Sequence, residues 1–253
     1  MFAGLTTEEA NKPIALHLEK IGALFALKKI EHQYPHCWRC HKPVIFRATS
    51  QWFCSVDDFK DDAVKAAEDV KWFPEWGKDR LQSMVKERAD WCISRQRKWG
   101  VPIPVVYCQD CGKEIIDNDI MMKVSKIFGE EGSDAWFAHD TEYFLPEGFK
   151  CPHCGSAKGF DKEKDIMDVW FDSGSSHAAV CARRKYLKVP ADVYLEGADQ
   201  YRGWFQSSLL TSVAGGHGAP YKQIITHGWT VDGEGKAMHK SLGNGVDPAD
   251  IVK

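Results

Sequence analysis

The sequence predicts an α/β fold in which a doubly wound parallel sheet carries an inserted zinc-knuckle module. Two short apolar stretches, residues 193–196 and 223–227, flank a segment with helical apolar spacing at residues 202–214. A strand, a helix and a second strand in this order are typical of a right-handed parallel crossover. Paired cysteines lie in the charged segment 106–160, which indicates a module held together by a metal.

The composition is that of an ordinary globular protein, and it excludes some classes of function. Of the 253 residues, 43% are hydrophobic and 27% are charged, and the formal net charge is -3. Such a charge gives no overall basic field, so any contact with nucleic acid requires a local basic patch. The sequence contains no signal peptide and no apolar stretch of the length, about 20 residues, that spans a bilayer. We therefore expect a cytoplasmic protein with no membrane partner.

The part of the chain before the cysteine-rich segment predicts a connector followed by a mixed segment. Residues 1–32 predict a helix and then a strand, and residues 57–70 and 77–88 have helical patterns. The expected organisation of the whole chain has four segments, at residues 1–32, 33–105, 106–160 and 161–253.

Six of the nine cysteines form three Cys-x-x-Cys pairs. Two pairs, Cys108/Cys111 and Cys151/Cys154, complete a closed set of four thiolates, which is the ligand set of a structural zinc ion. The alternative is two reduced turns without metal. The segment between them is too small and too charged to be expected to form its own core, so a metal is favoured. The third pair, Cys37 and Cys40, is either a free pair in a loop or half of a second zinc site.

Polar residues follow the two strands that flank the predicted helix. Glu196, Gly197, Asp199 and Gln200 follow the first strand, and His227-Gly228 end the second. Ligands of open parallel sheets bind beyond the carboxyl ends of the strands, so we expect these residues to share a crevice. The carboxylates suit an ammonium group or ribose hydroxyls. The alternative for Asp199 is a helix N-cap.

A glycine-rich loop at residues 232–244 carries Lys240 and Ser241. A mobile lysine of this kind can close on a triphosphate and stabilise charge that develops during reaction. On its own the pattern is weak, because most such loops are solvated turns.

The loop residues A-M-H-K-S-L-G-N at 237–244 resemble the K-M-S-K-S loop of the class I aminoacyl-tRNA synthetases. The stretch W-C-I-S-R-Q-R-K-W-G at residues 91–100 resembles a motif of the branch that handles branched aliphatic amino acids. We expect a short strand at residues 168–171, within the stretch D-V-W-F-D-S-G-S at 168–175. This stretch and residues 194–205 are similar to the isoleucine-specific members of that branch. These matches cover most of residues 30–253.

The resemblance implies ATP-dependent activation of isoleucine to isoleucyl-adenylate and transfer to the acceptor end of tRNA(Ile), with Mg²⁺ on the phosphates and structural Zn²⁺. It also implies a monomer. By position, it implies that Glu196, Gly197, Asp199 and Gln200 bind the adenylate and that Lys240 is catalytic. The other residues that it implicates are Trp170 and Trp204 in the isoleucine pocket, His227 and Gly228 at the adenine, Ser241 at the phosphates, and Arg95, Arg97 and Lys98 near the tRNA. The alternatives are core packing for the two tryptophans and a solvated basic turn for the cations.

Two features of the sequence depart from the family pattern. Ala237 and His239 replace the first lysine and the middle serine of the loop, and no H-x-G-H motif occurs anywhere in the chain. We therefore expect a fragment that holds the second half of the nucleotide-binding sheet and lacks activity alone, with residues 1–32 returning from a missing editing domain. Two other classes stay open: a zinc-dependent RNA-binding module and a valine-type synthetase fragment.

Overall fold

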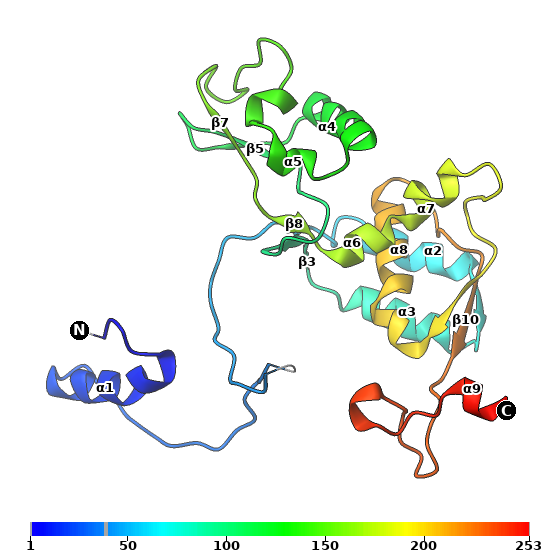
Figure 1. Ribbon diagram of the computed structural model, residues 1–253, viewed down its shortest axis with the longest axis horizontal. Coiled ribbons are helices and arrows are strands. Elements are labelled where there is room, and N and C mark those ends of the chain that lie inside the picture. The colour runs from blue at the N-terminus through cyan, green and yellow to red at the C-terminus, as the bar shows by residue number, and fades with distance from the viewer. Residues whose placement is uncertain (1, 38–39, 253) are drawn as a thin grey trace. The chain divides into compact units, whose positions relative to one another are not determined.

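A computed structural model describes residues 2–37 and 40–252 of the chain. The chain forms two compact units, Met1–Ser50 and Gln51–Lys253 (Figure 1). The contacts thus divide the chain at residue 50, whereas the sequence placed a segment boundary at residue 32. Among the described residues, no helix is both long enough and apolar enough to cross a membrane.

Among its described residues, the first unit contains one helix, α1 (Thr7–Lys20), and no strand. Thr6 and Glu9 form a reciprocal capping box at its start, and Gly22, at a φ of 73°, follows its end. The helix buries none of its residues. The strand expected after it is wrong: residues 23–30 have no strand partner in the described part of this unit, and most of them are exposed.

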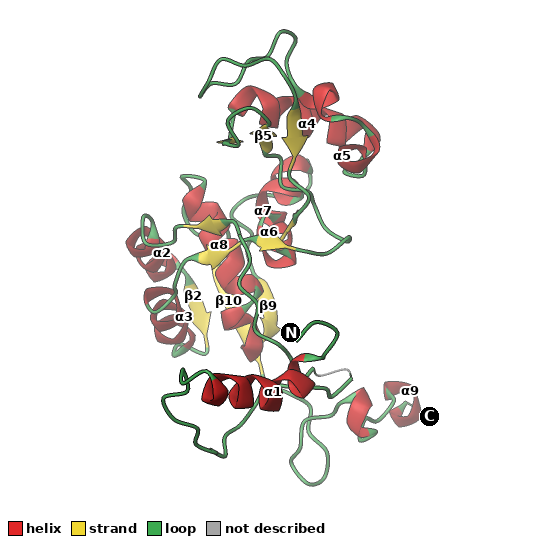
Figure 2. Ribbon diagram, turned by 90° about the vertical axis from the view of Figure 1, so that its left-hand side faces the viewer, coloured by secondary structure: helices red, strands yellow, loops and turns green. Residues whose placement is uncertain are grey.

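The sheet of the second unit is parallel and has three strands. Its order is β2 (Lys71–Phe73), β10 (Gln223–His227) and β9 (Tyr194–Gly197). Helix α8 (Trp204–Ala214) connects β9 to β10 and crosses the sheet in Figure 2. The two strands, the helix and their parallel pairing confirm the predicted crossover.

The core of this unit lies between the sheet and its helices. Trp72 of β2 stacks on Tyr201 at 6.3 Å between ring centroids, and Phe205, Tyr221 and Ile224 are at most 1% exposed. Helices α2 (Lys60–Ala66) and α3 (Gly77–Lys86) contribute to the same cluster. Burial of these aromatic side chains fixes the ends of the strands, where polar residues gather.

Residues 168–171, predicted as a strand, are not a strand. The strand β8 (Ile166–Met167) ends before them, and helix α6 (Val169–Gly174) follows. The carboxylate of Asp168 accepts a hydrogen bond from the backbone N–H of Trp170 and so caps the helix. Aspartate is a preferred N-cap, and a short apolar run does not by itself distinguish a strand from a buried helix.

Short antiparallel strands connect the sheet to the cysteine module. The strand β1 (Phe53–Cys54) pairs with β3 (Trp91–Cys92), and β4 (Ser94–Arg95) pairs with β8. The module has a sheet of its own, whose strands are β6 (Glu114–Ile115), β5 (Val106–Cys108) and β7 (Phe160–Lys162).

The remaining helices are α4 (Asn118–Glu131), α5 (Ala135–Ala138), α7 (Ser176–Ala179) and α9 (Pro248–Ile251). The 3-10 helices are η1 (Ala67–Asp69), η2 (Thr141–Phe144), η3 (Cys181–Arg183), η4 (Ala198–Arg202) and η5 (Lys240–Leu242).

The cysteine module has a hydrophobic core, contrary to the expectation from its charge. Trp136 and Phe144 are fully buried, with ring centroids 4.7 Å apart. Helix α4 adds Ile120, Val124 and Ile127 to the same cluster. The amphipathic spacing of α4 gathers its few apolar residues on one face, and overall charge does not reveal this arrangement.

Candidate functional site

The ends of strands β9 and β10 bring the predicted polar residues together. Gly197 pairs with His227 across the sheet, and Glu196 pairs with Thr226. A Cβ atom on Gly197 would lie 2.8 Å from Oδ1 of Asp199, 3.3 Å from the Trp229 ring and 3.5 Å from the His227 ring. Three side chains thus converge on position 197, and a side chain there would displace the Asp199 carboxylate.

Two carboxylates at this edge are available to a ligand. Glu196 and Asp199 are both exposed, and neither takes part in an ion pair between residues that the structure describes. Oδ2 of Asp199 accepts one hydrogen bond, from Nε2 of Gln200 at 3.0 Å. Negative charge without a local cation favours an ammonium group or hydroxyls over phosphate at this point.

Asp199 is not the N-cap of helix α8. The side chain of Gln200 does this work, because its Oε1 accepts a hydrogen bond from the backbone N–H of Trp204 at 2.8 Å. The amide of Gln200 thus joins the helix start to the Asp199 carboxylate. Asp199 is therefore not a helix N-cap, as the alternative interpretation held. Gln200 holds the Asp199 carboxylate in position beside the start of α8.

A hydrogen bond to the backbone orients the His227 ring. Nδ1 lies 2.7 Å from the carbonyl oxygen of Gly228, and a carbonyl only accepts, so Nδ1 is the donor. The side chain is exposed. The Trp229 ring is 6.4 Å from that of His227, at 81° to it.

The two tryptophans expected in a side-chain pocket have different surroundings. The Trp204 ring stacks on Tyr194 at 3.9 Å, and its Nε1 donates to the carbonyl oxygen of Ser173 at 3.0 Å. Trp170, on α6, is 44% exposed, and its ring would meet a Cβ on Gly203 at 3.0 Å. The structure thus gives Trp204 a packing role and leaves Trp170 partly exposed.

Lys240 and Ser241 lie on an exposed turn, η5, that is held only at its base. Asn244 donates to the Asp232 carboxylate at 2.7 Å and accepts from the backbone N–H of His239 at 2.9 Å. Hydrogen bonds from Asn244 and the backbone hold the pKa of Asp232 below its usual value. Among the residues that the structure describes, no hydrogen bond or ion pair joins Lys240 to the strand ends, so the base of the loop is closed and the lysine is exposed.

Sequence reasoning missed Asp168, which is 6% exposed and joins three segments. Its Oδ2 accepts from Nε1 of Trp91 at 3.0 Å and from Nη2 of Arg95 at 2.8 Å. Arg95 is therefore engaged in an ion pair with a buried carboxylate. The aspartate sits in a short apolar run, and the only available signal was its preference for helix N-caps.

The four module cysteines form one cluster, with their sulfur atoms all within 4.8 Å of one another. Sγ of Cys108 is 3.7 Å from that of Cys154, and Sγ of Cys111 is 3.7 Å from that of Cys151. Tetrahedral zinc, with Zn–S bonds of about 2.3 Å, needs sulfur atoms about 3.8 Å apart. The cluster therefore fits zinc, with no ligand position left for a reactive water.

The backbone of the module holds these sulfur atoms in two matching turns. In one, the N–H of Gly112 donates to the carbonyl of Cys108 at 2.8 Å, and in the other Gly155 donates to Cys151 at 2.8 Å. Burial raises the pKa of Cys151, but hydrogen bonds from the backbone N–H groups of His153 and Cys154 and from neighbouring thiols lower it to about 6. A backbone hydrogen bond from Ser156 lowers the pKa of Cys154, but burial and hydrogen bonds from the other three thiols of the cluster outweigh it and raise the pKa to about 12. The thiols thus share protons among themselves, and a metal ion would replace these protons.

The third cysteine pair, in the first unit, has the same two backbone hydrogen bonds at its ends. The N–H of His41 donates to the carbonyl of Cys37 at 2.8 Å, and the N–H of Cys37 donates to that of Lys42 at 2.8 Å. Cys40 is exposed. No cluster of three or more candidate ligands in residues 2–37 and 40–252 includes this pair.

Known proteins similar to this chain were found by sequence and by structure. The family model for tRNA synthetases class I (I, L, M and V) matches residues 6–253. The chain is 61% identical to an isoleucine–tRNA ligase of Caldicellulosiruptor bescii, covering 99% of this chain and 27% of the relative. It is 60% identical to the isoleucine–tRNA ligase of a Thermoanaerobacter species, with 100% and 27% covered. The chain thus spans about a quarter of the length of these relatives.

A solved structure supports the fold. Mycobacterium tuberculosis methionyl-tRNA synthetase bound by methionyl-adenylate superposes with a TM-score of 0.50 and 19% identity, covering 87% of this chain and 34% of that one. At this identity the likeness concerns the fold alone. The family match over residues 6–253 leads to one conclusion: the chain belongs to the class I tRNA synthetases of the isoleucine, leucine, methionine and valine group.

Proposed function

We propose that this chain carries the adenylate-holding half of an isoleucine–tRNA ligase active site. The observation that supports this most directly is the pairing of Gly197 with His227, with Asp199 beside them. This pairing gathers carboxylates, an imidazole and glycines at the carboxyl edge of parallel strands, where ligands bind in open α/β sheets. The identity of 61% to isoleucine–tRNA ligases favours isoleucine as the amino acid.

In this proposal the strand ends hold the amino-acid and ribose parts of isoleucyl-adenylate. The carboxylates of Glu196 and Asp199 attract the ammonium group and accept from ribose hydroxyls, and Gln200 orients Asp199. Gly197 lets the ligand approach the backbone. Trp170, which is 44% exposed, borders the isoleucine side chain.

The remaining residues act on the nucleotide and on the structure of the pocket. Trp204 does not contact the ligand in this proposal. It supports the pocket, because it packs on Tyr194 and its backbone N–H binds Gln200 at the start of α8. His227 and Gly228 border the adenine. Lys240 and Ser241 close on the phosphates.

The proposed reaction has two steps. The isoleucine carboxylate attacks the α-phosphorus of ATP, the bond to the bridging oxygen breaks, and pyrophosphate leaves. The terminal ribose hydroxyl of tRNA(Ile) then attacks the carbonyl carbon, and AMP leaves. Lys240 contributes by stabilising negative charge on the phosphates during the first step. Mg²⁺ on the phosphates would supply further positive charge.

The proposal includes the setting of the site. The three parallel strands are one half of a doubly wound sheet, and zinc on Cys108, Cys111, Cys151 and Cys154 holds the inserted module. The protein works as a cytoplasmic monomer. The division into segments at residues 32, 105 and 160 belongs to the same proposal.

The test is calorimetric binding of non-hydrolysable isoleucyl- and valyl-adenylate analogues to the purified chain. We expect the isoleucyl analogue to bind at least about 10-fold more tightly, which is the lower range for one methylene in a hydrophobic pocket. Asp199→Asn should weaken both analogues, and Lys86→Ala, on the exposed side of α3, should weaken neither. Tighter binding of the valyl analogue would assign the chain to a valine enzyme. Measurable ATP–pyrophosphate exchange by the chain alone would show that the chain carries a complete active site, contrary to the proposal.

A further inference from the structure

Asp168 is a buried carboxylate to which the proposed reaction gives no role. The residue lies between β8 and α6 and is 6% exposed. Oδ2 accepts hydrogen bonds from Nε1 of Trp91 at 3.0 Å and from Nη2 of Arg95 at 2.8 Å, and Oδ1 accepts from the backbone N–H of Trp170 at 3.3 Å. An apolar residue would fill a buried place without the cost of removing a charge from water. The distinctive property of Asp168 is therefore that it fixes groups from three segments at once.

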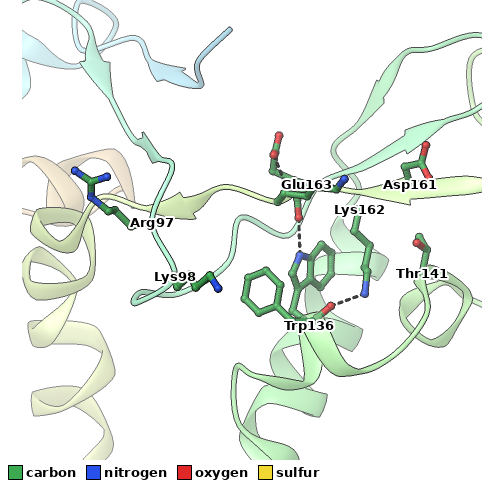
Figure 3. Close-up of a pocket in the computed structure, with 9 residues that line it drawn as sticks. Arg97, Lys98, Trp136, Thr141, Asp161, Lys162 and Glu163 are labelled. Atoms are coloured by element: carbon green, nitrogen blue, oxygen red, sulfur yellow. Dashed lines mark hydrogen bonds between the residues drawn. The ribbon is translucent and has the colours of Figure 1, made fainter. Parts of the chain in front are cut away.

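Arg95 differs from the two cations that follow it in the chain. Its Nη1 donates to two backbone carbonyl oxygens of its own segment, both at 2.8 Å, while Nη2 binds Asp168. Arg97 and Lys98, by contrast, lie on the loop after β4 and line a cleft of about 810 Å³ (Figure 3). Neither of them takes part in an ion pair between described residues. The position of Arg95 is thus matched to the Asp168 carboxylate and not to the cleft.

The start of α6 is tied to the segment of β3 and β4 through the same aspartate. The backbone N–H of Asp168 donates to the carbonyl oxygen of Ile93 at 2.7 Å, and the carbonyl oxygen of Asp168 accepts from the N–H of Phe171 at 2.7 Å. Helix α6 has only six residues, fewer than a helix needs to be stable on its own. Its position therefore depends on the contacts at its start, and Asp168 supplies these through both backbone and side chain.

Helix α6 carries Trp170 against the start of α8 (Figure 1). A Cβ on Gly174 of α6 would lie 2.8 Å from the carbonyl oxygen of Ser207 on α8, so the two backbones approach closely. A Cβ on Gly203 would lie 3.0 Å from the Trp170 ring and 2.5 Å from Oε1 of Gln200. The ring and this amide therefore meet at one glycine, and a shift of α6 would move the ring relative to Gln200.

We propose that Asp168 is a positioning residue for the choice of amino acid: by fixing the start of α6, it sets how closely the Trp170 ring approaches the ligand side chain. This inference rests on the proposed function, in which Trp170 borders the isoleucine side chain. Asp168 itself does not touch the ligand. One methylene in a hydrophobic pocket changes affinity by about 10-fold to 200-fold, and such a pocket needs walls that are held to within about 0.5 Å. The pair of Asp168 with Arg95 supplies this constraint.

The test compares calorimetric binding of non-hydrolysable isoleucyl- and valyl-adenylate analogues to the purified chain and to Asp168→Asn. Asparagine caps helices as well as aspartate does, so the cap of α6 is kept. Its amide has no charge to offer Arg95 and presents a donor where the carboxylate only accepts, which weakens the bonds to Trp91 and Arg95. We expect the preference for the isoleucyl analogue to fall from about 10-fold to about 2-fold. The affinity for the valyl analogue should stay within about 2-fold, because its shorter side chain depends less on the Trp170 wall.

Further variants separate this role from a general loss of structure. Arg95→Gln removes the ion pair but leaves the bond from Trp91 to Asp168, so it should lower the preference in the same direction and by less. The double variant should match Asp168→Asn, because both changes remove one shared contact. Asp192→Asn is the matched control, because it breaks exposed ion pairs with Lys188 and Lys222. It should keep the full preference.

The ratio of the two affinities decides the outcome. An equal loss of affinity for both analogues in Asp168→Asn would show a structural role only and overturn the proposal. A preference retained in both Asp168→Asn and Arg95→Gln would overturn it as well, while leaving the adenylate proposal standing. If Asp168→Asn does not fold, Arg95→Gln decides by the same ratio, because the Arg95 side chain is 41% exposed and its loss is better tolerated. Failure of the unmodified chain to bind either analogue would instead overturn the adenylate proposal, and this one with it.

Discussion

The three Cys-x-x-Cys turns have the same backbone hydrogen bonds and very different surroundings. In the module, Cys108/Cys111 and Cys151/Cys154 face each other over a buried core that includes Trp136. In the first unit, the Cys37/Cys40 turn lies on a chain whose one helix buries no residue. Local sequence is therefore enough to form the turn. A four-sulfur site also needs a second turn, brought to it by tertiary packing.

The largest expected effect is loss of the module metal. Cys108→Ser removes one of four thiolates, and since a structural zinc ion depends on the complete set, we expect zinc to fall from about one per chain to nearly none. Metal analysis of the purified chain measures this. Cys37→Ser is the matched control and should leave the zinc content unchanged. A second zinc ion in the unmodified chain, lost in Cys37→Ser, would show that the first-unit turn binds metal as well.

Truncation of the module core should have the next largest effect. Trp136→Ala leaves a cavity in place of a fully buried ring and removes the hydrogen bond to Glu163, so we expect about 3–5 kcal/mol lower stability. Phe25→Ala, in the first unit, changes a side chain that is 103% exposed and should alter stability by less than about 0.5 kcal/mol. Denaturant unfolding compares the two. Equal effects would mean that the module core does not stabilise the module.

The Glu163 carboxylate, which accepts hydrogen bonds from Tyr107 of the module and from Trp52 before β1, predicts a dependence of stability on pH. Burial raises the pKa of Glu163, but hydrogen bonds from Tyr107, Asp165, Trp52 and Lys164 outweigh it and lower the pKa. A lowered pKa means that the carboxylate stabilises the fold above its unfolded pKa of about 4.3, and that this contribution is lost as pH falls. Glu163→Gln should therefore lower the melting temperature at pH 7 and make it less sensitive to acid below about pH 5.

The hydrogen bond from Tyr107 to Glu163 predicts a second pH dependence of stability, at alkaline pH. Burial and the bond to Glu163 raise the pKa of Tyr107 to about 12. The neutral phenol thus stabilises the fold below its unfolded pKa of about 10, and this contribution is lost as pH rises toward 12. Tyr107→Phe should make the melting temperature depend less on pH in that alkaline range. Below about pH 5, it should change the pH dependence of the melting temperature less than Glu163→Gln does. If the melting temperature depended on pH in the same way in both variants and in the unmodified chain, the hydrogen bond between Tyr107 and Glu163 would not contribute to stability.

The sequence predicted the parts of the fold that repeat a simple pattern. Strands at 193–196 and 223–227 and the helix between them have clear apolar spacing, and they are present. The four-cysteine cluster followed from its spacing. The core of the module was missed because its residues come from several distant elements.

The site was predictable to the same extent. Alignment of Gly197 with His227 followed from the parallel crossover. The ion pair of Arg95 with Asp168 did not, because no local pattern links residues so far apart in the chain. The same holds for the clamp of Asn244 on Asp232, which joins the two ends of a loop.

The smallest expected effect concerns the residue that closes each turn. Gly112, at a φ of 69°, holds this position in the module, and His41, at a φ of 56°, holds it in the first unit. A left-handed residue with a Cβ costs about 1 kcal/mol relative to glycine. A Cβ on Gly112 would meet no atom within 4 Å, so Gly112→Ala isolates this backbone cost and should weaken zinc retention about 5-fold against a chelator.

The reverse change completes the comparison of the two turns. His41→Gly relieves the same strain where the described structure shows no four-sulfur cluster to benefit from it. We expect it to leave the zinc content and the chelator kinetics as they were. If His41→Gly instead increased the zinc bound per chain, backbone strain, and not the lack of a facing turn, would be what separates the Cys37/Cys40 turn from the module.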